Sequence, residues 1–216
     1  MIRLAVFDLD GTLVDSLQDL WHAVNHALVA VGLPRRTLDE VRGFVGEGAP
    51  MLVRRSVAPR QDLFEPALAA WRAHYREHLL DHTRLFPGID RILASAPCTL
   101  AVHTNKPGAM ARRILDGLGV LGRFAAVVGG DEAPRKPDPA GTLAILARAG
   151  VAPSEAVLVG DSHIDRATAA AAGVRFLAVG WGLVPEAELE AAGATTIVRS
   201  AAELAPWLAG EAPGGG

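Results

Sequence analysis

Short apolar runs, each ending at polar or glycine-rich residues, constrain the fold of this chain more than any other feature. Five of them stand out, at residues 4–7, 100–103, 124–128, 156–159 and 174–179. Continuous apolar runs of this length are typical of strands that are buried on both faces of a parallel sheet. A sheet of this kind needs helices on both sides, so the segments between the runs decide the architecture.

Helix-length segments separate the later runs, and each of these segments ends at a glycine: 107–118, 139–149 and 162–172. Glycine commonly terminates a helix, because it adopts the left-handed backbone conformation at little cost. Strand and helix therefore alternate from about residue 98 onward. This alternation predicts an α/β fold with a doubly wound, Rossmann-like parallel sheet.

The first apolar run stands apart, because the next convincing strand begins only near Cys98, whereas a βαβ unit needs about 30 residues or slightly more. Residues 16–83 carry helical signals instead. Among them are two patterns typical of N-terminal capping boxes, Ser16-x-x-Asp19 and Thr37-x-x-Glu40. We therefore expect an inserted α-helical cap subdomain.

The predicted domain organisation follows from that insertion. Residues 1–15 and 84–210 are expected to form the α/β core, residues 16–83 the helical cap, and residues 211–216 a disordered tail rich in glycine.

Composition and charge limit the class of protein. Half of the 216 residues are apolar, the formal net charge is −3, and no long run of lysine or arginine occurs, so a nucleic-acid partner is not expected. No stretch approaches the roughly 20 apolar residues of a membrane helix. The single cysteine, Cys98, cannot form an internal disulfide and is expected to be a core residue. We expect a cytoplasmic protein that binds a small ligand.

Two carboxylates follow the first predicted strand. Asp8 and Asp10 are separated by one residue, so they share one side of an extended segment and can converge on one ligand. Ligands of open α/β sheets bind beyond the carboxyl ends of the strands. Because Asp and Gly are also ordinary turn formers, a purely structural interpretation of this segment stays open.

Three later segments place polar side chains after further strands. Thr104 and Asn105 lie before a helix and suit an anionic oxygen, although a simple helix cap would look the same. Lys136 could balance charge between a carboxylate and a transferring phosphoryl group, or could be a solvated surface lysine. Asp161 and Asp165 provide oxygen ligands of the kind that Mg²⁺ prefers, with a helix N-cap at Asp161 as the alternative.

These four segments, taken together and in this order, resemble the motifs of the haloacid dehalogenase-like superfamily, over essentially residues 2–210. The resemblance is strongest to the phosphoglycolate phosphatase-like subfamily. It implies that Asp8 is the nucleophile that takes the phosphoryl group, and that Asp10 protonates the leaving alcohol and then activates water. It also implies that Thr104, with Asn105 beside it, holds the phosphoryl oxygens.

The resemblance further implies a magnesium site and a charge partner for the nucleophile. Mg²⁺ would lie between the Asp8 carboxylate, the Asp10 backbone carbonyl and Asp161, with Asp165 supporting the metal shell, while Lys136 would stabilise the nucleophile and the developing charge. The acid at Asp10 disfavours a haloacid dehalogenase, because a halide leaving group needs no proton.

In the cap, the segment from Arg42 to Ala49 is similar to a loop of phosphoglycolate phosphatases. We expect Arg42 and Glu47 in it to contribute to substrate binding. A simpler interpretation, in which Gly46 and Gly48 only end a short helix, stays open.

The sequence thus predicts a hydrolase: a Mg²⁺-dependent phosphomonoesterase for a small phosphorylated metabolite, with 2-phosphoglycolate as the best single substrate. Alternatives with the same chemistry are a pyrophosphatase, a nucleotidase or a β-phosphoglucomutase-like phosphomutase. A noncatalytic binding protein is a further alternative, although every expected catalytic residue is present. We expect a monomer or homodimer.

Overall fold

A computed structural model describes residues 1–211, and its centre is a six-stranded, fully parallel sheet. The strands are β1 (Leu4–Phe7), β4 (Thr99–His103), β5 (Ala126–Val128), β6 (Ala156–Gly160), β7 (Arg175–Val179) and β8 (Ile197–Val198). Each of the five apolar runs contains or overlaps one of the first five of these strands. The predicted α/β fold is confirmed.

The strand order, β5-β4-β1-β6-β7-β8, makes the sheet doubly wound. The chain runs outward from β1 through β4 and β5, then crosses to β6 on the other side of β1 and continues to β7 and β8. Ligands of such sheets bind beyond the carboxyl ends of the strands, where the order reverses. Here that point lies between β1 and β6, where the Asp8 amide donates to the carbonyl oxygen of Val159 at 2.9 Å.

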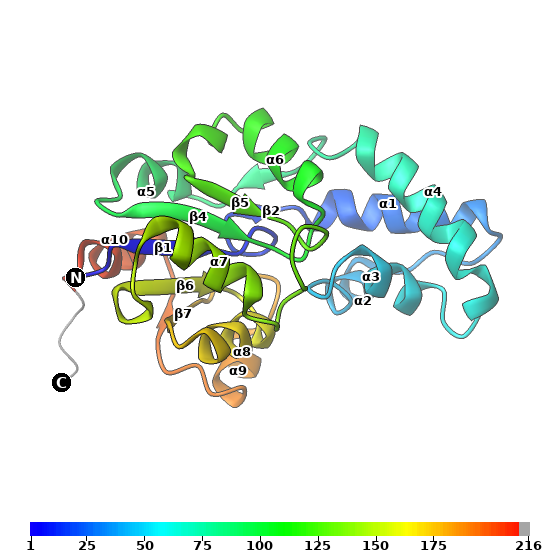
Figure 1. The fold of residues 1–216 in the computed structure, drawn as a ribbon. Helices are drawn as coiled ribbons and strands as arrows, with labels where there is room; N and C mark the ends of the chain where they lie inside the picture. The colour runs from blue at the N-terminus through cyan, green and yellow to red at the C-terminus, as the bar shows by residue number, and fades with distance from the viewer. Residues whose placement is uncertain (212–216) are drawn as a thin grey trace.

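Helices cover both faces of the sheet (Figure 1). Alternate residues of β1 belong to different apolar clusters. Ala5 and Phe7 lie in the cluster that includes residues of α5 (Ile89–Ser95), α6 (Gly108–Gly117) and α10 (Ala201–Ala209). Leu4 and Val6 lie in the cluster that includes residues of α7 (Ala140–Ala149) and α8 (His163–Ala172). Burial on both faces explains why the strands are continuously apolar rather than alternating.

Four further helices lie beyond the carboxyl ends of the strands, at the right in Figure 1. They are α1 (Leu17–Ala30), α2 (Leu38–Arg42), α3 (Ala49–Ser56) and α4 (Phe64–Glu77). Helices α1 and α4 pack against each other, and the apolar stripe of α1 is buried at Leu20, Val24 and Leu28. The remaining helical elements are α9 (Glu186–Ala191) and the short 3₁₀ turns Gln61–Leu63, Leu121–Arg123 and Pro153–Glu155.

A two-stranded antiparallel ribbon joins these helices to the sheet domain. It pairs β2 (Val14–Asp15) with β3 (Arg84–Leu85). Nearby, the buried Asp19 carboxylate accepts hydrogen bonds from the His82 amide at 3.0 Å and from the Thr83 amide and hydroxyl at 2.8 and 2.7 Å. These contacts hold both ends of residues 16–83, hereafter the cap, together. The proposed domain boundaries stay a prediction, which the ribbon supports.

Only one of the two predicted capping boxes forms. Thr37 and Glu40 make the reciprocal side-chain to backbone bonds at the start of α2. The prediction for Ser16 and Asp19 is wrong, because both side chains bond to residues outside α1. The Ser16 hydroxyl donates to Asp10 at 2.5 Å instead of capping α1, and Asp19 holds the far end of the cap.

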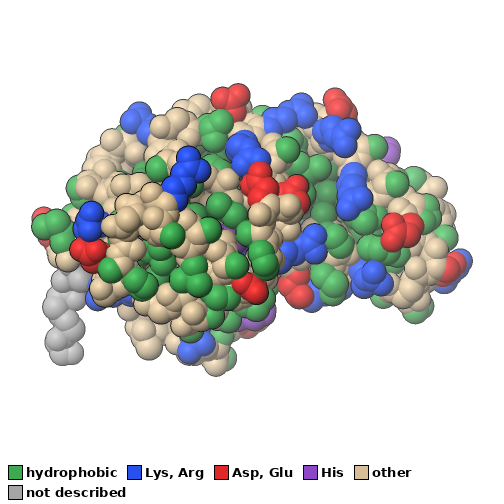
Figure 2. Space-filling view, viewed as in Figure 1, with side chains coloured by type: hydrophobic (Ala, Val, Ile, Leu, Met, Phe, Trp, Pro, Cys, Tyr) green, Lys and Arg blue, Asp and Glu red, His purple; other side chains and the backbone are tan. Residues whose placement is uncertain are grey.

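The surface is mixed in charge, and Figure 2 shows basic and acidic side chains interspersed over the face that it views. Among residues 1–211, no helix is long and apolar enough to cross a membrane. Cys98 is half-buried and packs against the main apolar cluster. The predicted tail lies, from residue 212 onward, outside the described residues.

Two leucines test the assignment of the core. Leu158 on β6 is 1% exposed, whereas Leu143 on α7 is 42% exposed. We expect Leu158→Ala to lower the free energy of unfolding by about 2–5 kcal/mol, because it leaves a cavity between sheet and helices. Leu143→Ala, the matched control, is expected to change it by less than about 0.5 kcal/mol. Urea denaturation measures both values, and similar losses for the two variants would contradict the packing described here.

Candidate active site

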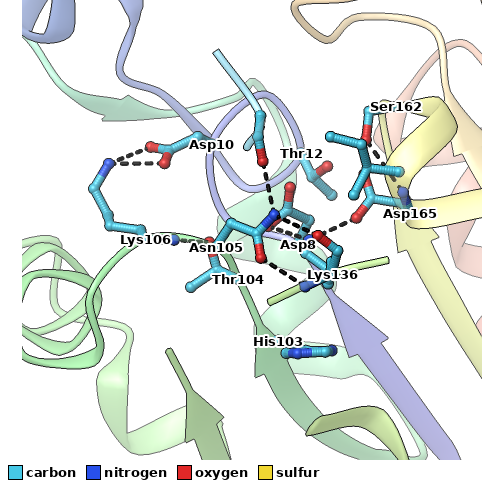
Figure 3. Close-up of polar contacts among 12 residues, drawn as sticks. Asp8, Asp10, Thr12, His103, Thr104, Asn105, Lys106, Lys136, Ser162 and Asp165 are labelled. Carbon is cyan, nitrogen blue, oxygen red and sulfur yellow. Dashed lines mark hydrogen bonds and ion pairs between the residues drawn. The ribbon is translucent and has the colours of Figure 1, made fainter. Parts of the chain in front are cut away.

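The polar segments that follow the strands meet at the carboxyl ends of the strands (Figure 3), on the side of the sheet where helices α1 to α4 lie (Figure 1). Asp8 follows β1, Thr104 follows β4, Lys136 lies between β5 and α7, and Asp161 follows β6. A cavity opens there, bounded on one side by the cap and on the other by residues that include Asp8, Asp10, Thr104, Asn105, Lys106 and Asp161. The strand-end motifs therefore form one site.

Three buried carboxylates form the floor of this site. Asp8, Asp161 and Asp165 each place an oxygen within 4.8 Å of the other two. Burial raises the pKa of Asp161 to about 8, and the neighbouring charges of Asp165 and Asp8 act in the same direction. Burial also raises the pKa of Asp8 to about 6, although the Lys136 charge opposes it. Such a cluster of oxygen donors fits a divalent cation, which would relieve the repulsion.

Lys136 connects two of these carboxylates. Its ammonium lies 2.8 Å from Asp8 Oδ1 and 2.6 Å from Asp165 Oδ1. Burial alone would lower the pKa of this lysine, but the two carboxylates outweigh that effect and the net shift is upward. Lys136 therefore stays charged beside Asp8. The other oxygen of Asp165 accepts from the Ser162 hydroxyl at 2.5 Å, which holds Asp165 in place from both sides.

Two glycines allow the backbone to approach Asp161 closely. A Cβ at Gly11, where φ is +83°, would lie 2.1 Å from Asp161 Oδ2, and a Cβ at Gly182 would lie 2.2 Å from Asp161 Cβ. The amide of Leu183 then donates to Asp161 Oδ2 at 2.7 Å. Sequence reasoning missed the contribution of Leu183, and the only available signal was the glycine-rich segment around Gly182.

Asp10 points away from the carboxylate cluster and toward the cavity (Figure 3). Its two oxygens lie 2.6 and 2.8 Å from the Lys106 ammonium, and one of them also accepts from the Ser16 hydroxyl at 2.5 Å. Neither Lys106 nor Ser16 was predicted as a site residue. The position of Lys106 directly after Thr104 and Asn105 was the one signal for it.

Thr104 and Asn105 have different surroundings. Thr104 is buried, lines the cavity and accepts a hydrogen bond from the Lys106 amide at 3.2 Å. The Asn105 amide group donates to the carbonyl oxygens of Lys136 at 3.0 Å and Gly46 at 2.9 Å, and accepts from the Lys136 amide at 2.8 Å. Asn105 thus fixes the loop that carries Lys136 and contacts the cap. Its predicted contact with phosphoryl oxygens stays a prediction.

The two predicted cap residues lie outside the cavity. Arg42 is exposed and pairs with Asp39 at 2.8 Å, and Glu47 pairs with Arg55. The cap residues that do line the cavity are small or apolar: Leu20, Val45, Gly46, Gly48, Ala49, Leu52 and Trp71. The loop therefore reaches the site through its backbone and small residues, and a substrate contact by Arg42 or Glu47 stays a prediction.

Comparison with known proteins agrees with this geometry. A family model described as haloacid dehalogenase-like hydrolase matches residues 5–179. The chain belongs to this family. The match spans β1 to β7, so it includes every strand that carries a site residue. The resemblance found in the sequence is confirmed, and the protein is a hydrolase.

Individual relatives point the same way. A phosphoglycolate phosphatase of Rhodospirillum rubrum is 40% identical, with 100% of this chain and 94% of the relative covered. A phosphoglycolate phosphatase of Pseudomonas putida is 38% identical, with 98% of this chain and 82% of the relative covered. A crystal structure described as a predicted phosphoglycolate phosphatase of Haemophilus somnus superimposes with a TM-score of 0.87 at 31% identity, covering 94% of this chain and 96% of that one. The subfamily resemblance is confirmed with them.

The raised pKa of Asp161 gives a pH-dependent prediction. Because its folded-state pKa, about 8, lies above the ordinary value of 3.8, ionisation of Asp161 lowers the free energy of unfolding as pH rises from about 4 through 8 when no cation is bound. In a chelator, Asp161→Asn should therefore raise Tm, and more at pH 8 than at pH 5, by about 2–4 °C for each kcal/mol gained. Thermal unfolding measures this difference.

Added Mg²⁺ should make the Tm of the wild type higher than that of Asp161→Asn. A cation that binds only the folded state raises Tm, so the wild type should gain and Asp161→Asn should gain little. A variant that is less stable than the wild type in chelator at pH 8, or that responds equally to Mg²⁺, would contradict the assignment of Asp161 to a strained metal site.

Proposed function

We propose that the protein is a Mg²⁺-dependent phosphomonoesterase that forms an aspartyl-phosphate on Asp8 and acts on 2-phosphoglycolate. The arrangement of Asp8 carries this proposal. One of its oxygens pairs with Lys136 at 2.8 Å, it lies among the carboxylates of the candidate metal site, and it lines the same cavity as Asp10. The names of the relatives support the choice of substrate.

The residues around Asp8 would keep it charged and hold the magnesium ion beside it. Lys136 favours the charged form of Asp8 and lies where negative charge would develop during transfer. Asp8, Asp161 and the Asp10 backbone carbonyl would hold the magnesium ion, with Asp165 held in place by Lys136 and Ser162. A bound magnesium ion would neutralise phosphoryl charge, which matters because positioning and charge neutralisation dominate phosphoryl transfer. Thr104 would contact the phosphoryl oxygens.

Asp10 would serve as general acid and base. It protonates the leaving alcohol while Asp8 attacks phosphorus, and it later takes a proton from the water that hydrolyses the aspartyl-phosphate. Its side chain lines the cavity and is fixed by Ser16 and Lys106. A fixed carboxylate on the leaving-group side suits both steps.

The catalytic assignment is tested by phosphate release from p-nitrophenyl phosphate in Mg²⁺. We expect Asp8→Asn to lower kcat by at least about 10³-fold, because the amide cannot serve as nucleophile. Asp116→Asn, a change of the same kind on the exposed side of α6, is the control and should retain wild-type activity. Substantial turnover by Asp8→Asn would exclude the covalent route.

The substrate assignment is tested with 2-phosphoglycolate, pyrophosphate, nucleoside monophosphates and sugar phosphates. We expect kcat/KM for 2-phosphoglycolate to exceed the others about 100-fold, equivalent to about 2.7 kcal/mol of transition-state discrimination. Preference for pyrophosphate or a nucleotide would favour those alternative phosphohydrolases, and transfer of the phosphoryl group back to a sugar would indicate a phosphomutase.

A further inference from the structure

The chain uses lysine only inside its active site. It contains two lysines against 19 arginines, and both lysines, Lys106 and Lys136, are buried, with exposures of 6% and 4%. The two residue types are not interchangeable, since lysine presents a compact charge on a flexible stem. Lys136 has a role in the proposed reaction. Lys106 has none beyond its contact with Asp10, so its burial needs a further explanation.

Lys106 has hydrogen-bonding capacity to spare. Its ammonium lies 2.6 and 2.8 Å from the two oxygens of Asp10 and 5.0 Å from the centre of the Tyr75 ring. An ammonium carries three N–H donors, and Asp10 accepts two of them. The residue also lines the cavity. Burial lowers the pKa of Lys106, whereas Asp10 and the Tyr75 hydroxyl lie close enough to raise it, so the third donor faces both this hydroxyl and the cavity. A buried charge is costly unless its donors are satisfied, and an anionic acceptor in the cavity would satisfy this one.

Two more donors in the cap lack acceptors. Among the described residues, neither Trp71 Nε1 nor the Tyr75 hydroxyl has a hydrogen-bond partner, although both atoms are buried. The two rings stack with centroids 4.7 Å apart on α4, and Trp71 lines the cavity. Burial raises the pKa of Tyr75 to about 12, so its hydroxyl keeps its proton. Buried polar groups are nearly always paired, and these unpaired donors lie at the wall of the cavity, in Trp71, and next to Lys106, in Tyr75.

We propose that Lys106, with Trp71 and Tyr75, binds a carboxylate on the leaving group and so selects phosphate esters of short 2-hydroxy acids. This inference rests on the proposed function. The leaving oxygen must lie within reach of Asp10 to take its proton, and the Lys106 ammonium lies within hydrogen-bond distance of that carboxylate. A carboxylate one carbon from the leaving oxygen therefore reaches Lys106. The side chains of Leu20 and Leu52 line the same cavity and disfavour a polar extension.

The competing explanation is that Lys106 only positions Asp10. The two roles differ in what they do to selectivity. A lysine that acts only through Asp10 affects every ester equally, whereas a lysine that binds the carboxylate changes the ratio between an ester that carries this group and one that lacks it. 2-Phosphoglycolate and 2-hydroxyethyl phosphate form such a pair, because they differ by a carboxylate in place of a hydroxymethyl group.

Kinetics on this pair gives the first test. In Lys106→Met, which keeps the stem and removes the charge, the ratio of kcat/KM for 2-phosphoglycolate over 2-hydroxyethyl phosphate should fall about 10- to 100-fold, as expected for loss of a charge-assisted hydrogen bond. Tyr75→Phe, which removes only the hydroxyl, should lower the ratio less, by about 3- to 10-fold. An unchanged ratio in both variants overturns the proposal. If Lys106→Met fails to fold, the ratio measured for Tyr75→Phe alone decides.

The scarcity of lysine allows a direct test of binding. Protein labelled with ¹³C-lysine contains only two labelled side chains, and Lys106→Met assigns them. In Asp8→Asn with Mg²⁺, 2-phosphoglycolate should shift the Lys106 signal, and 2-hydroxyethyl phosphate should shift it much less. Equal shifts with both esters, or none with either, overturn the proposal. Because this variant need not turn over substrate, the result is independent of hydrolysis, and a wild type that releases no phosphate would refute the proposed function instead.

Discussion

Repulsion among three buried carboxylates is the constraint on which the rest of the site depends. Asp8, Asp161 and Asp165 come from positions up to 157 residues apart in the chain, and only the reversal of strand order between β1 and β6 brings them within 4.8 Å of one another. One lysine offsets part of their charge. The remaining repulsion favours binding of a cation among the three carboxylates, and it is at the same time a cost to the stability of the fold.

The fold and the core of the site could be predicted from sequence because the decisive signals are local. Continuous apolar runs locate the strands, and the direction of a parallel sheet sends the residue after each strand to the same edge. Asp8, Thr104 and Asp161 each follow such a run directly, which is why their convergence did not depend on any knowledge of tertiary contacts. Lys136 lies farther from the strand that precedes it, so its prediction as a site residue depended on the motif around it.

The remaining details depend on which side chains meet in the folded structure. Ser16 has the local pattern of a helix cap, yet its hydroxyl donates to Asp10, which precedes it in the chain. Lys106 was not predicted as a site residue, because no residue near it in the sequence indicates that its ammonium pairs with Asp10. In the cap loop, Arg42 and Glu47 are the chemically conspicuous residues, but they pair within the cap, and the small residues between them approach the core. Polar residues attract attention in a sequence, whereas close approach selects for small ones.

Asn105 links the loop that carries Lys136 to the cap. Two of its hydrogen bonds run to the backbone of Lys136, and one runs to Gly46 in the cap. If the cap were to move away from the sheet domain, only the bond to Gly46 would have to break, and both bonds to the backbone of Lys136 would remain. The position of the Lys136 loop would therefore not depend on whether the cap lies over the site. Asn105 thus links the cap to the sheet domain through one bond, while its other two bonds hold the loop that keeps Lys136 beside Asp8.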